Sequence, residues 1–228
     1  MSRARFRAVV FDMDGLMLDT EPIYRRASQL AATEFDCRFT DELYASLIGR
    51  AAADIEAVLR ANFGTGFPID AFRGRWQAHW RGIVEREGIP VKAGLPALLA
   101  ELEALDVPLA VATSTHSDRA GFSLAAAGIR TRFRAFVTGD RVHCGKPAPD
   151  IYLRAASELD VAAAECLALE DSEAGVLSAS AAGMRTFMVP DLVAPTVAAA
   201  RAAYRIVESL PQAQPHILAL LAHGERDA

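Results

Sequence analysis

The sequence predicts an α/β protein: a doubly wound parallel sheet with helices on both faces, and an all-helical domain inserted near its start. Two observations support this. Beyond residue 88, short apolar runs alternate with helical segments, which is typical of buried parallel strands. Residues 20–88 show helical periodicity and no convincing strand, although a strand precedes them. We therefore predict a core made of residues 1–19 and 89–228, and a helical domain made of residues 20–88.

The individual elements follow in order from periodicity and from Gly and Pro breaks. Residues 9–11 have high β propensity and predict the first strand. Thr20 can cap the first inserted helix, and further helices are predicted at residues 41–48, 51–62 and 69–87. In the core, the predicted helices are 95–105, 121–127, 149–159 and 173–182, with an Ala-rich helical tail from Val193. The predicted strands are 108–113, 135–138, 166–169 and 185–189, with a short last strand at 204–207.

Composition and charge exclude several classes of protein. Hydrophobic residues make up 52% and charged residues 23% of the 228 residues, and the net charge is −5 without a basic run. This balance gives no sign of nucleic-acid binding. The odd, widely spaced Cys37, Cys144 and Cys166 fit neither a zinc site nor a disulfide framework, which favours a reducing cytoplasm. The first seven residues are basic, and the apolar run after them stops at Asp12, which is too short for a signal peptide or a membrane span. We expect a cytoplasmic monomer or weak dimer.

The end of the first strand carries the most informative residues. Asp12 and Asp14 lie two apart in an extended segment and point to the same side, and Gly15 lets the chain turn away. Two carboxylates on one side repel each other unless a cation, a proton or a phosphate partner balances them. A calcium loop is the alternative, but its first ligand position would fall on Val10, and the preceding residues resemble a strand. This stretch therefore favours catalysis or metal binding over solvated turn aspartates.

Polar residues also follow three other predicted strands. Ser114 and Thr115 offer hydroxyl and backbone N–H groups suited to phosphate oxygens, although such residues also cap many helices. Lys146 lies between Gly and Pro on a stiffened backbone and could contact an anion, although a solvated lysine is commoner. Glu170 and Asp171 could complete a magnesium site or could simply favour the start of a helix. Ligands in such sheets bind at the carboxyl ends of the strands, so these residues are predicted to meet.

These motifs, taken together and in order, resemble those of the haloacid dehalogenase superfamily of phosphatases, most closely its β-phosphoglucomutase-like branch. The likeness extends from residue 8 to about residue 190, and four ordered motifs are highly specific. The family implies a Rossmann-like core with a helical cap inserted after the first strand. The four motifs are Phe11-Asp12-Met13-Asp14-Gly15, Thr113-Ser114, Gly145-Lys146-Pro147 and Glu170-Asp171-Ser172.

The resemblance implies a mechanism and a cofactor. Asp12 would be the nucleophile that forms an aspartyl-phosphate, and Asp14 would be the general acid and then the general base. Mg²⁺ would be held by Asp12, by the backbone carbonyl of Asp14 and by Asp171, with Glu170 as a direct or water-mediated ligand. Ser114 and Lys146 would hold the phosphoryl oxygens. The partner would be a small phosphorylated sugar or nucleoside, with no nucleic acid or membrane involved.

The cap residues decide between the alternatives within this family. Arg50 lies where relatives place a loop facing the active site, and it could meet an anionic or hydroxyl-rich part of the substrate. Tyr24 stands where the mutases of this branch place a His, which favours hydrolysis over a phosphosugar mutase. A catalytically silent binding protein is a further alternative, although every chemical position carries a competent residue. A dehalogenase would lack Asp14, and phosphonate cleavage would need a cap Lys that residues 20–88 do not contain.

Overall fold

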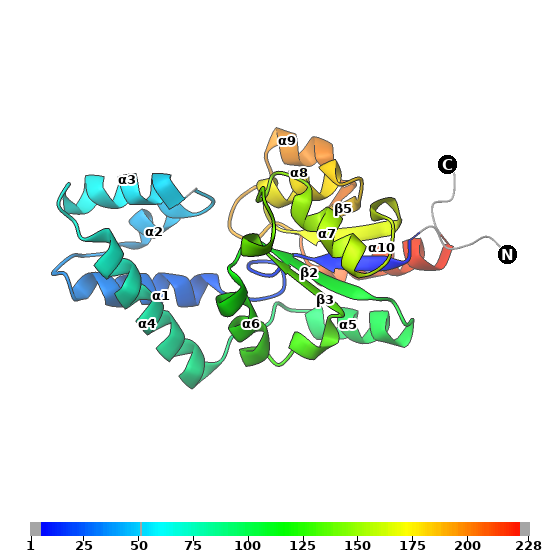
Figure 1. The fold of residues 1–228 in the computed structure, drawn as a ribbon, viewed down its shortest axis with the longest axis horizontal. Helices are drawn as coiled ribbons and strands as arrows, with labels where there is room; N and C mark the ends of the chain where they lie inside the picture. Colours follow the sequence, from blue (N-terminus) through cyan, green and yellow to red (C-terminus); the bar gives the residue numbers. More distant parts are fainter. Residues whose placement is uncertain (1–5, 51, 224–228) are drawn as a thin grey trace. The chain divides into compact units, whose positions relative to one another are not determined.

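The computed structural model describes residues 6–50 and 52–223, which fall into two compact units (Figure 1). One unit contains residues 1–19 and 90–228, of which the described part forms the sheet and its helices. The other unit is Thr20–Ile89 and is helical. We retain, as a proposal, the interpretation that these units are a core and an inserted domain.

The first unit is built on a six-stranded sheet in the order β3-β2-β1-β4-β5-β6, and every pairing is parallel. This confirms the predicted α/β class. β1 lies between β2 and β4, and Phe11 pairs with Val111 on one side and with Leu169 on the other. The strands are β1 (Ala8–Phe11), β2 (Leu109–Thr113), β3 (Ala135–Thr138), β4 (Cys166–Glu170), β5 (Arg185–Met188) and β6 (Arg205–Ile206).

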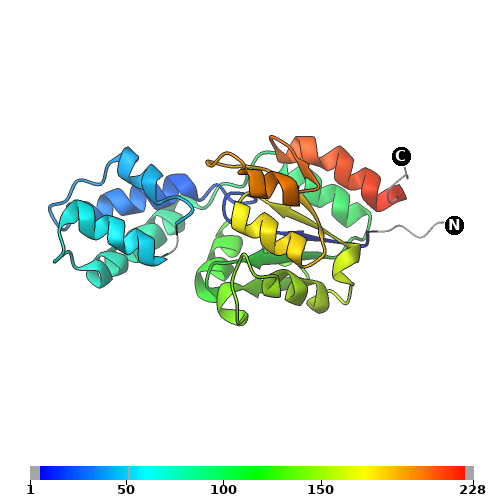
Figure 2. The same cartoon turned by 90° about the horizontal axis from the view of Figure 1, so that it is seen from above.

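Helices cover both faces of the sheet, as Figure 2 shows for α5 with α10 on one side and α7 with α8 on the other. All four residues of β1 are fully buried, because apolar side chains on both sides of a strand need cover on both faces. Ala8 and Val10 pack with Ile151 of α7 in one core cluster. The helices are α5 (Leu95–Ala104), α6 (Ser117–Ala126), α7 (Asp150–Glu158), α8 (Glu173–Ala181), α9 (Val197–Ala202) and α10 (Leu210–His223), with short 3₁₀ turns at Arg130–Arg132, Gly139–Arg141 and Ala163–Glu165.

The second unit has its own core of aromatic side chains. Phe39 stacks on Phe72 with ring centroids 6.3 Å apart, and Phe67 lies 4.9 Å from Phe63. Thr20 precedes the first helix but its hydroxyl makes no capping bond, so the predicted cap is wrong; its backbone is already helical there. Residue 51, with which one predicted helix begins, lies outside the described residues. The helices are α1 (Glu21–Thr33), α2 (Asp41–Leu47), α3 (Ala52–Phe63) and α4 (Ile69–Glu87).

The two chain segments at the boundary of the first unit pair with each other. Asp19 N–H donates to the Pro90 carbonyl at 2.9 Å, and Lys92 N–H donates to the Met17 carbonyl at 2.8 Å. Lys92 also donates through Nζ to Asp19 at 3.0 Å and to Asp191 at 2.7 Å. These bonds fix the turn after β1 against the segment that precedes α5.

Neither the helices nor the cysteines point to a membrane or a disulfide. Among residues 6–50 and 52–223, no helix combines the length and the apolar character that a bilayer crossing requires. Cys37, Cys144 and Cys166 are all free thiols.

Candidate active site

The chemistry-bearing residues gather where the strand order of the sheet reverses. β1 is followed in the chain by β2 on one side, whereas its other neighbour is β4. Such a reversal opens a crevice at the carboxyl ends of the strands. Asp12 follows β1 there, while Glu170 ends β4 and Asp171 follows it. The sheet therefore brings together acids that are more than 150 positions apart in the sequence.

Lys146 lies at the centre of this group. Its Nζ donates to Asp12 Oδ1 and to Glu170 Oε1, both at 2.5 Å, and to the Ala112 carbonyl at 3.0 Å. The side chains of Lys146, Asp12 and Glu170 are 5%, 10% and 0% exposed. A buried ammonium with three acceptors is held in one position, so the predicted solvated alternative for Lys146 does not describe this structure.

The Glu170 carboxylate accepts more hydrogen bonds than the Lys146 ammonium donates. Described residues give its carboxylate five hydrogen bonds: to Oε1 from Lys146 Nζ and the Tyr152 hydroxyl, and to Oε2 from Asp171 N–H, Ser172 N–H and Ser172 Oγ. The N-terminus of α8 supplies the last group of donors, and a helix N-terminus favours negative charge. Gly175 makes the room, because a Cβ at that position would overlap the Glu170 carboxylate.

The electrostatics show an excess of buried negative charge. Burial, with the charges of Glu170 and Asp14 adding to it, raises the pKa of Asp12 to about 8 against the opposing effect of Lys146. Burial and the charges of Asp12 and Glu170 raise the pKa of Asp171 well above its usual range. Although burial works to lower it, the pKa of Lys146 is raised because Asp12 and Glu170 stabilise the ammonium. The group therefore favours an additional cation.

The donor set suits a hard divalent cation. Asp12, Glu170 and Asp171 each offer a carboxylate oxygen, and these oxygens lie within 4.8 Å of one another. Carboxylate oxygens are the ligands that Mg²⁺ prefers, and Mg²⁺ usually takes one or two of them and keeps several waters. Three acids beside a single lysine leave negative charge for such an ion to balance. The residues present therefore fit Mg²⁺.

Asp14 lies at the side of this group, within the turn after β1. Gly15 N–H donates to the Leu18 carbonyl at 3.0 Å, and Gly15 has a positive φ of 83°, which a residue with a side chain rarely adopts. The Asp14 carboxylate accepts a hydrogen bond from Thr115 Oγ1 at 2.7 Å. Thr115 is buried, whereas the neighbouring Ser114 is exposed. The two hydroxyls that the sequence grouped together thus have different surroundings.

The two cap candidates belong to the helical unit. Arg50 is exposed, and its Nε donates to the Ser46 carbonyl at 2.5 Å. Tyr24 is half-buried, and its ring lies 5.5 Å from the ring of Trp76. Tyr24 therefore contributes to the packing of α1 on α4.

Sequence reasoning gave no role to three residues of the site. Thr113, the last residue of β2, is buried and accepts a hydrogen bond from Thr115 N–H at 3.1 Å. Tyr152 is completely buried and donates to Glu170 at 2.7 Å. Gly175 gives Glu170 its space. Thr113 belongs to one of the four motifs, as a hydroxyl residue that ends an apolar strand.

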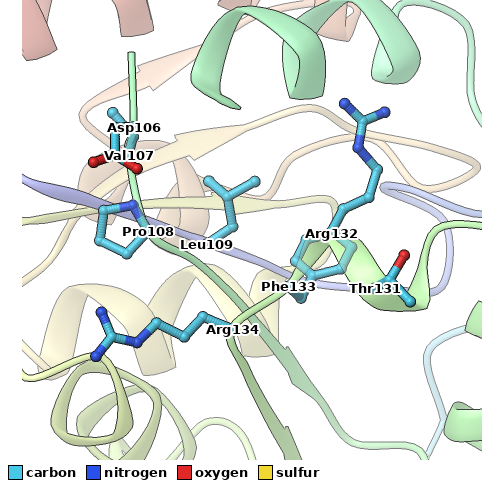
Figure 3. Close-up of a pocket in the computed structure, with 8 residues that line it drawn as sticks. All are labelled: Asp106, Val107, Pro108, Leu109, Thr131, Arg132, Phe133 and Arg134. Carbon is cyan, nitrogen blue, oxygen red and sulfur yellow. The ribbon is translucent and has the colours of Figure 1, made fainter. Parts of the chain in front are cut away.

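A cavity of about 360 Å³ lies at the opposite edge of the sheet, before the first residues of β2 and β3 (Figure 3). In Figure 3 the side chains of Arg132 and Arg134 extend away from each other, and Arg132 donates to Glu103 at 2.5 Å. The lining groups therefore do not converge on a common point as the acids around Lys146 do. Its lining consists of Asp106, Val107, Pro108, Leu109, Thr131, Arg132, Phe133 and Arg134.

Known proteins resemble this chain in sequence and in structure. Residues 6–183 match the family of haloacid dehalogenase-like hydrolases. The (DL)-glycerol-3-phosphatase 2 of Arabidopsis thaliana is 32% identical over 83% of this chain and 81% of its own length. The phosphorylated carbohydrates phosphatase of Thermotoga maritima is 30% identical over 78% of this chain and 82% of its own.

A crystal structure also resembles this chain in its fold. A protein from Thermotoga maritima, provisionally described as a β-phosphoglucomutase, has a TM-score of 0.80 and 27% identity, covering 93% of this chain and 98% of its own. Its fold agrees with the parallel sheet described above. The family match and the two phosphatase relatives show that the chain belongs to the haloacid dehalogenase-like hydrolases.

Proposed function

We propose that the protein is a Mg²⁺-dependent phosphoric monoester hydrolase that acts on a small phosphorylated metabolite through an aspartyl-phosphate at Asp12. The observation that carries the proposal is the buried contact of Asp12 with Lys146, beside Glu170 and Asp171. A carboxylate at the end of a central strand, next to a fixed ammonium, is suited to attack phosphorus while the ammonium stabilises charge on the phosphoryl oxygens.

Asp12, the backbone carbonyl of Asp14 and Asp171 would hold the Mg²⁺, with Glu170 as a direct or water-mediated ligand. When bound, the ion would reduce the repulsion between the Asp12 carboxylate and the negatively charged phosphoryl group. The raised pKa of Asp12 means that its carboxyl group holds a proton when no cation is bound. A bound cation would favour the ionised form that a nucleophile needs, which supports a metal beside Asp12.

The remaining core residues would manage the proton and the phosphoryl oxygens. Asp14 would donate a proton to the leaving alcohol as the phosphorus–oxygen bond breaks, and it would then take a proton from the water that attacks the aspartyl-phosphate. Its partly exposed position beside the buried Asp12 supports separate roles for the two acids. Lys146 and Ser114 would hold the phosphoryl oxygens in line.

The substrate class follows from the helical unit and from the relatives. Several arginines of that unit are paired with acids, as Arg26 is with Glu87 at 2.7 Å. Arg50 instead donates to a backbone carbonyl, and its exposed guanidinium is suited to an anionic or hydroxyl-rich part of a substrate. The two phosphatase relatives act on a glycerol phosphate and on phosphorylated carbohydrates. A sugar or nucleoside phosphate is therefore the proposed substrate, and the helical unit would close over it and exclude water.

A substrate panel tests the proposal directly. Purified protein with Mg²⁺ is assayed for phosphate release from sugar phosphates, nucleotides, glycerol 3-phosphate and phosphorylated organic acids, with Asp12→Asn and EDTA as controls. We expect release from a small group of sugar or nucleoside esters, and none in either control. Activity that Asp12→Asn retains would overturn the nucleophile, and inactivity of folded, Mg²⁺-loaded protein on all esters would favour a silent binding protein.

A phosphosugar mutase is the second candidate, favoured by the structural likeness to a protein described as a β-phosphoglucomutase. Tyr24 argues against it, since its ring packs on Trp76 where the mutases have a His. The test is incubation with β-glucose 1-phosphate and a bisphosphate primer. Phosphate release without glucose 6-phosphate is the expected result, and efficient formation of glucose 6-phosphate would favour the mutase.

A further inference from the structure

Thr115 is a buried residue that contacts Asp14, the proposed general acid and base. It lies two residues beyond Thr113, the end of β2, and only 7% of it is exposed. Its Oγ1 donates to Asp14 Oδ2 at 2.7 Å. A threonine hydroxyl has one hydrogen to donate. In this arrangement Thr115 therefore bonds the carboxylate of Asp14 rather than a phosphoryl oxygen, the partner that the sequence suggested.

The backbone around Thr115 is held from two sides. Thr115 N–H donates to Thr113 Oγ1 at 3.1 Å, and Gly139 N–H approaches the Thr115 carbonyl at 3.4 Å. Gly139 permits this approach, because a Cβ there would lie 2.5 Å from the Ser114 carbonyl oxygen. The Thr115 hydroxyl is thus presented by a fixed backbone and not by a mobile loop.

The Asp14 backbone is fixed as well. Leu18 N–H donates to the Met13 carbonyl at 3.0 Å, and Asp14 forms a bridge with Leu18 across the same turn. With both backbones held, the hydrogen bond between Thr115 and Asp14 selects one orientation of the carboxylate. The bond is made to Oδ2 of Asp14.

We propose that Thr115 is a positioning residue for proton transfer by Asp14, an inference that rests on the proposed acid–base role of Asp14. Thr115 accepts no proton itself. In the first step an Asp12 carboxylate oxygen bonds phosphorus as the bond from phosphorus to the leaving oxygen breaks. Asp14 gives its proton to that leaving oxygen while its carboxyl group keeps the hydrogen bond from Thr115. In the second step the Asp14 carboxylate takes a proton from water as the water oxygen bonds phosphorus and the bond between Asp12 and phosphorus breaks. The carboxyl group is then restored.

Leaving-group dependence separates positioning from a purely structural role. A general acid matters most when the leaving group is a strong base and little when it is a weak one. We would measure kcat/KM for 4-nitrophenyl phosphate, phenyl phosphate and the best alkyl ester of the substrate panel. The variants are Thr115→Val, which keeps the shape without the hydroxyl, Thr115→Ser, which restores it, and Asp14→Asn as the reference.

The expected result is a steeper dependence on leaving-group basicity in Thr115→Val. Loss of a hydrogen bond to a charged group would lower kcat/KM about tenfold more for phenyl phosphate than for 4-nitrophenyl phosphate. Thr115→Ser should recover the wild-type dependence, and Asp14→Asn should steepen it further. Thr186→Val is the matched control, since Thr186 is a buried hydroxyl residue on β5, away from the site. It should leave the dependence unaltered.

The outcomes distinguish the two hypotheses. If Asp14→Asn steepens the dependence and Thr115→Val lowers all three rate constants equally or not at all, the positioning role is wrong and the acid–base role stands. If Asp14→Asn leaves the dependence unchanged, the proposed function of Asp14 is wrong and the inference fails with it. Thr115→Ala repeats the test should Thr115→Val fail to fold.

Discussion

The ion pairs around Lys146 and those on the surface of the helical unit use the same kinds of side chain in opposite surroundings. Lys146, Asp12 and Glu170 are almost completely buried. Arg26 of α1 and Glu87 of α4 form a pair of similar length, but their side chains are 51% and 46% exposed. Water and salt screen the exposed pair, so it adds little stability, whereas the buried charges depend on one another.

This difference in burial indicates which charged residues contribute to stability and which contribute to chemistry. A buried charge is costly to place, and the group around Lys146 accumulates three acids beside one base. Such an arrangement is a poor way to stabilise a fold and a good way to bind a cation and a phosphoryl group. The comparison predicts large effects for changes at the buried group and small ones at the surface.

The largest effect is expected for Asp12→Asn. The amide cannot act as the nucleophile, and the reaction loses its covalent step, so kcat should fall by about 10⁴-fold or more. The measurement is phosphate release under saturating substrate and Mg²⁺, with circular dichroism as a control for folding. A loss below about tenfold would show that this carboxylate does not attack phosphorus.

Lys146→Met should affect activity and stability together. It removes the charge that we assign to the phosphoryl oxygens, which predicts a loss of about 10²–10³-fold in kcat. It also leaves the buried Asp12 and Glu170 without their cationic partner, which predicts a loss of about 3–5 kcal/mol in the free energy of unfolding without metal. Urea denaturation in EDTA measures this. An unchanged midpoint would break the contrast between buried and exposed pairs.

Metal removal should make stability depend on pH. Burial raises the pKa of Asp12 from 3.8 to about 8, so the folded protein holds this proton more tightly than the unfolded chain. The stabilisation from this group is complete at low pH and is lost as the pH rises through the folded value. In EDTA, the melting temperature should therefore fall from about pH 4 to about pH 8 and level off above that.

Mg²⁺ should reverse this loss, because it binds the ionised carboxylates. At a concentration about 100 times its Kd, the ion should add about 2.7 kcal/mol to the free energy of unfolding. The gain should be largest at the alkaline end of the range, and the pH dependence in EDTA should be weaker in Asp12→Asn. A melting temperature that rises with pH in EDTA would contradict the upward direction of the Asp12 pKa shift.

Tyr152→Phe should have an intermediate effect. It removes one of the five hydrogen bonds to Glu170 and keeps the buried ring, over which Lys146 Nζ lies 5.1 Å from the centroid. The expected cost is about 1–2 kcal/mol in the free energy of unfolding, measured by urea denaturation. A cost as large as that of Lys146→Met would mean that the phenol, and not the ammonium, holds the group together.

Arg26→Ala should have the smallest effect. The lost pair with Glu87 is exposed, so the expected change in the free energy of unfolding is about 0–1 kcal/mol. The change should shrink further at high salt, because screening weakens exposed pairs. A loss that matched Lys146→Met, and that salt did not reduce, would remove the distinction between the two regions.

The sequence predicted the sheet because its strands are continuous apolar runs, and parallel strands buried on both faces leave that pattern. It was less successful at boundaries that depend on distant residues. Helix α6 begins at Ser117, four residues before the predicted start, because Asp140 accepts hydrogen bonds from Ser117 N–H at 3.0 Å and from its hydroxyl. Glu170 is the last residue of β4 although the apolar run ends at Leu169, since Lys146 balances its charge and Tyr152 donates a hydrogen bond to it.

The residues of the candidate site also differ in how far the sequence alone predicts them. Asp12, Lys146, Glu170 and Asp171 carry chemistry in their residue types and follow recognisable strands, so the sequence could propose them. Tyr152 and Gly175 look like ordinary core residues of two helices, and only their contacts with Glu170 give them meaning. The hydrogen bond between Thr115 and Asp14 joins positions about a hundred residues apart, and no local sequence pattern predicts it.

Gly175 sets a limit on how this enzyme could be redesigned. Its missing side chain lets a helix backbone close directly over the Glu170 carboxylate, so that the two occupy space that no larger residue could share. Substitution by even alanine would push the acid out of its pocket and release the lysine that depends on it. Efforts to give the protein a new specificity can therefore target exposed positions of the helical unit, while this small residue on α8 has to be kept.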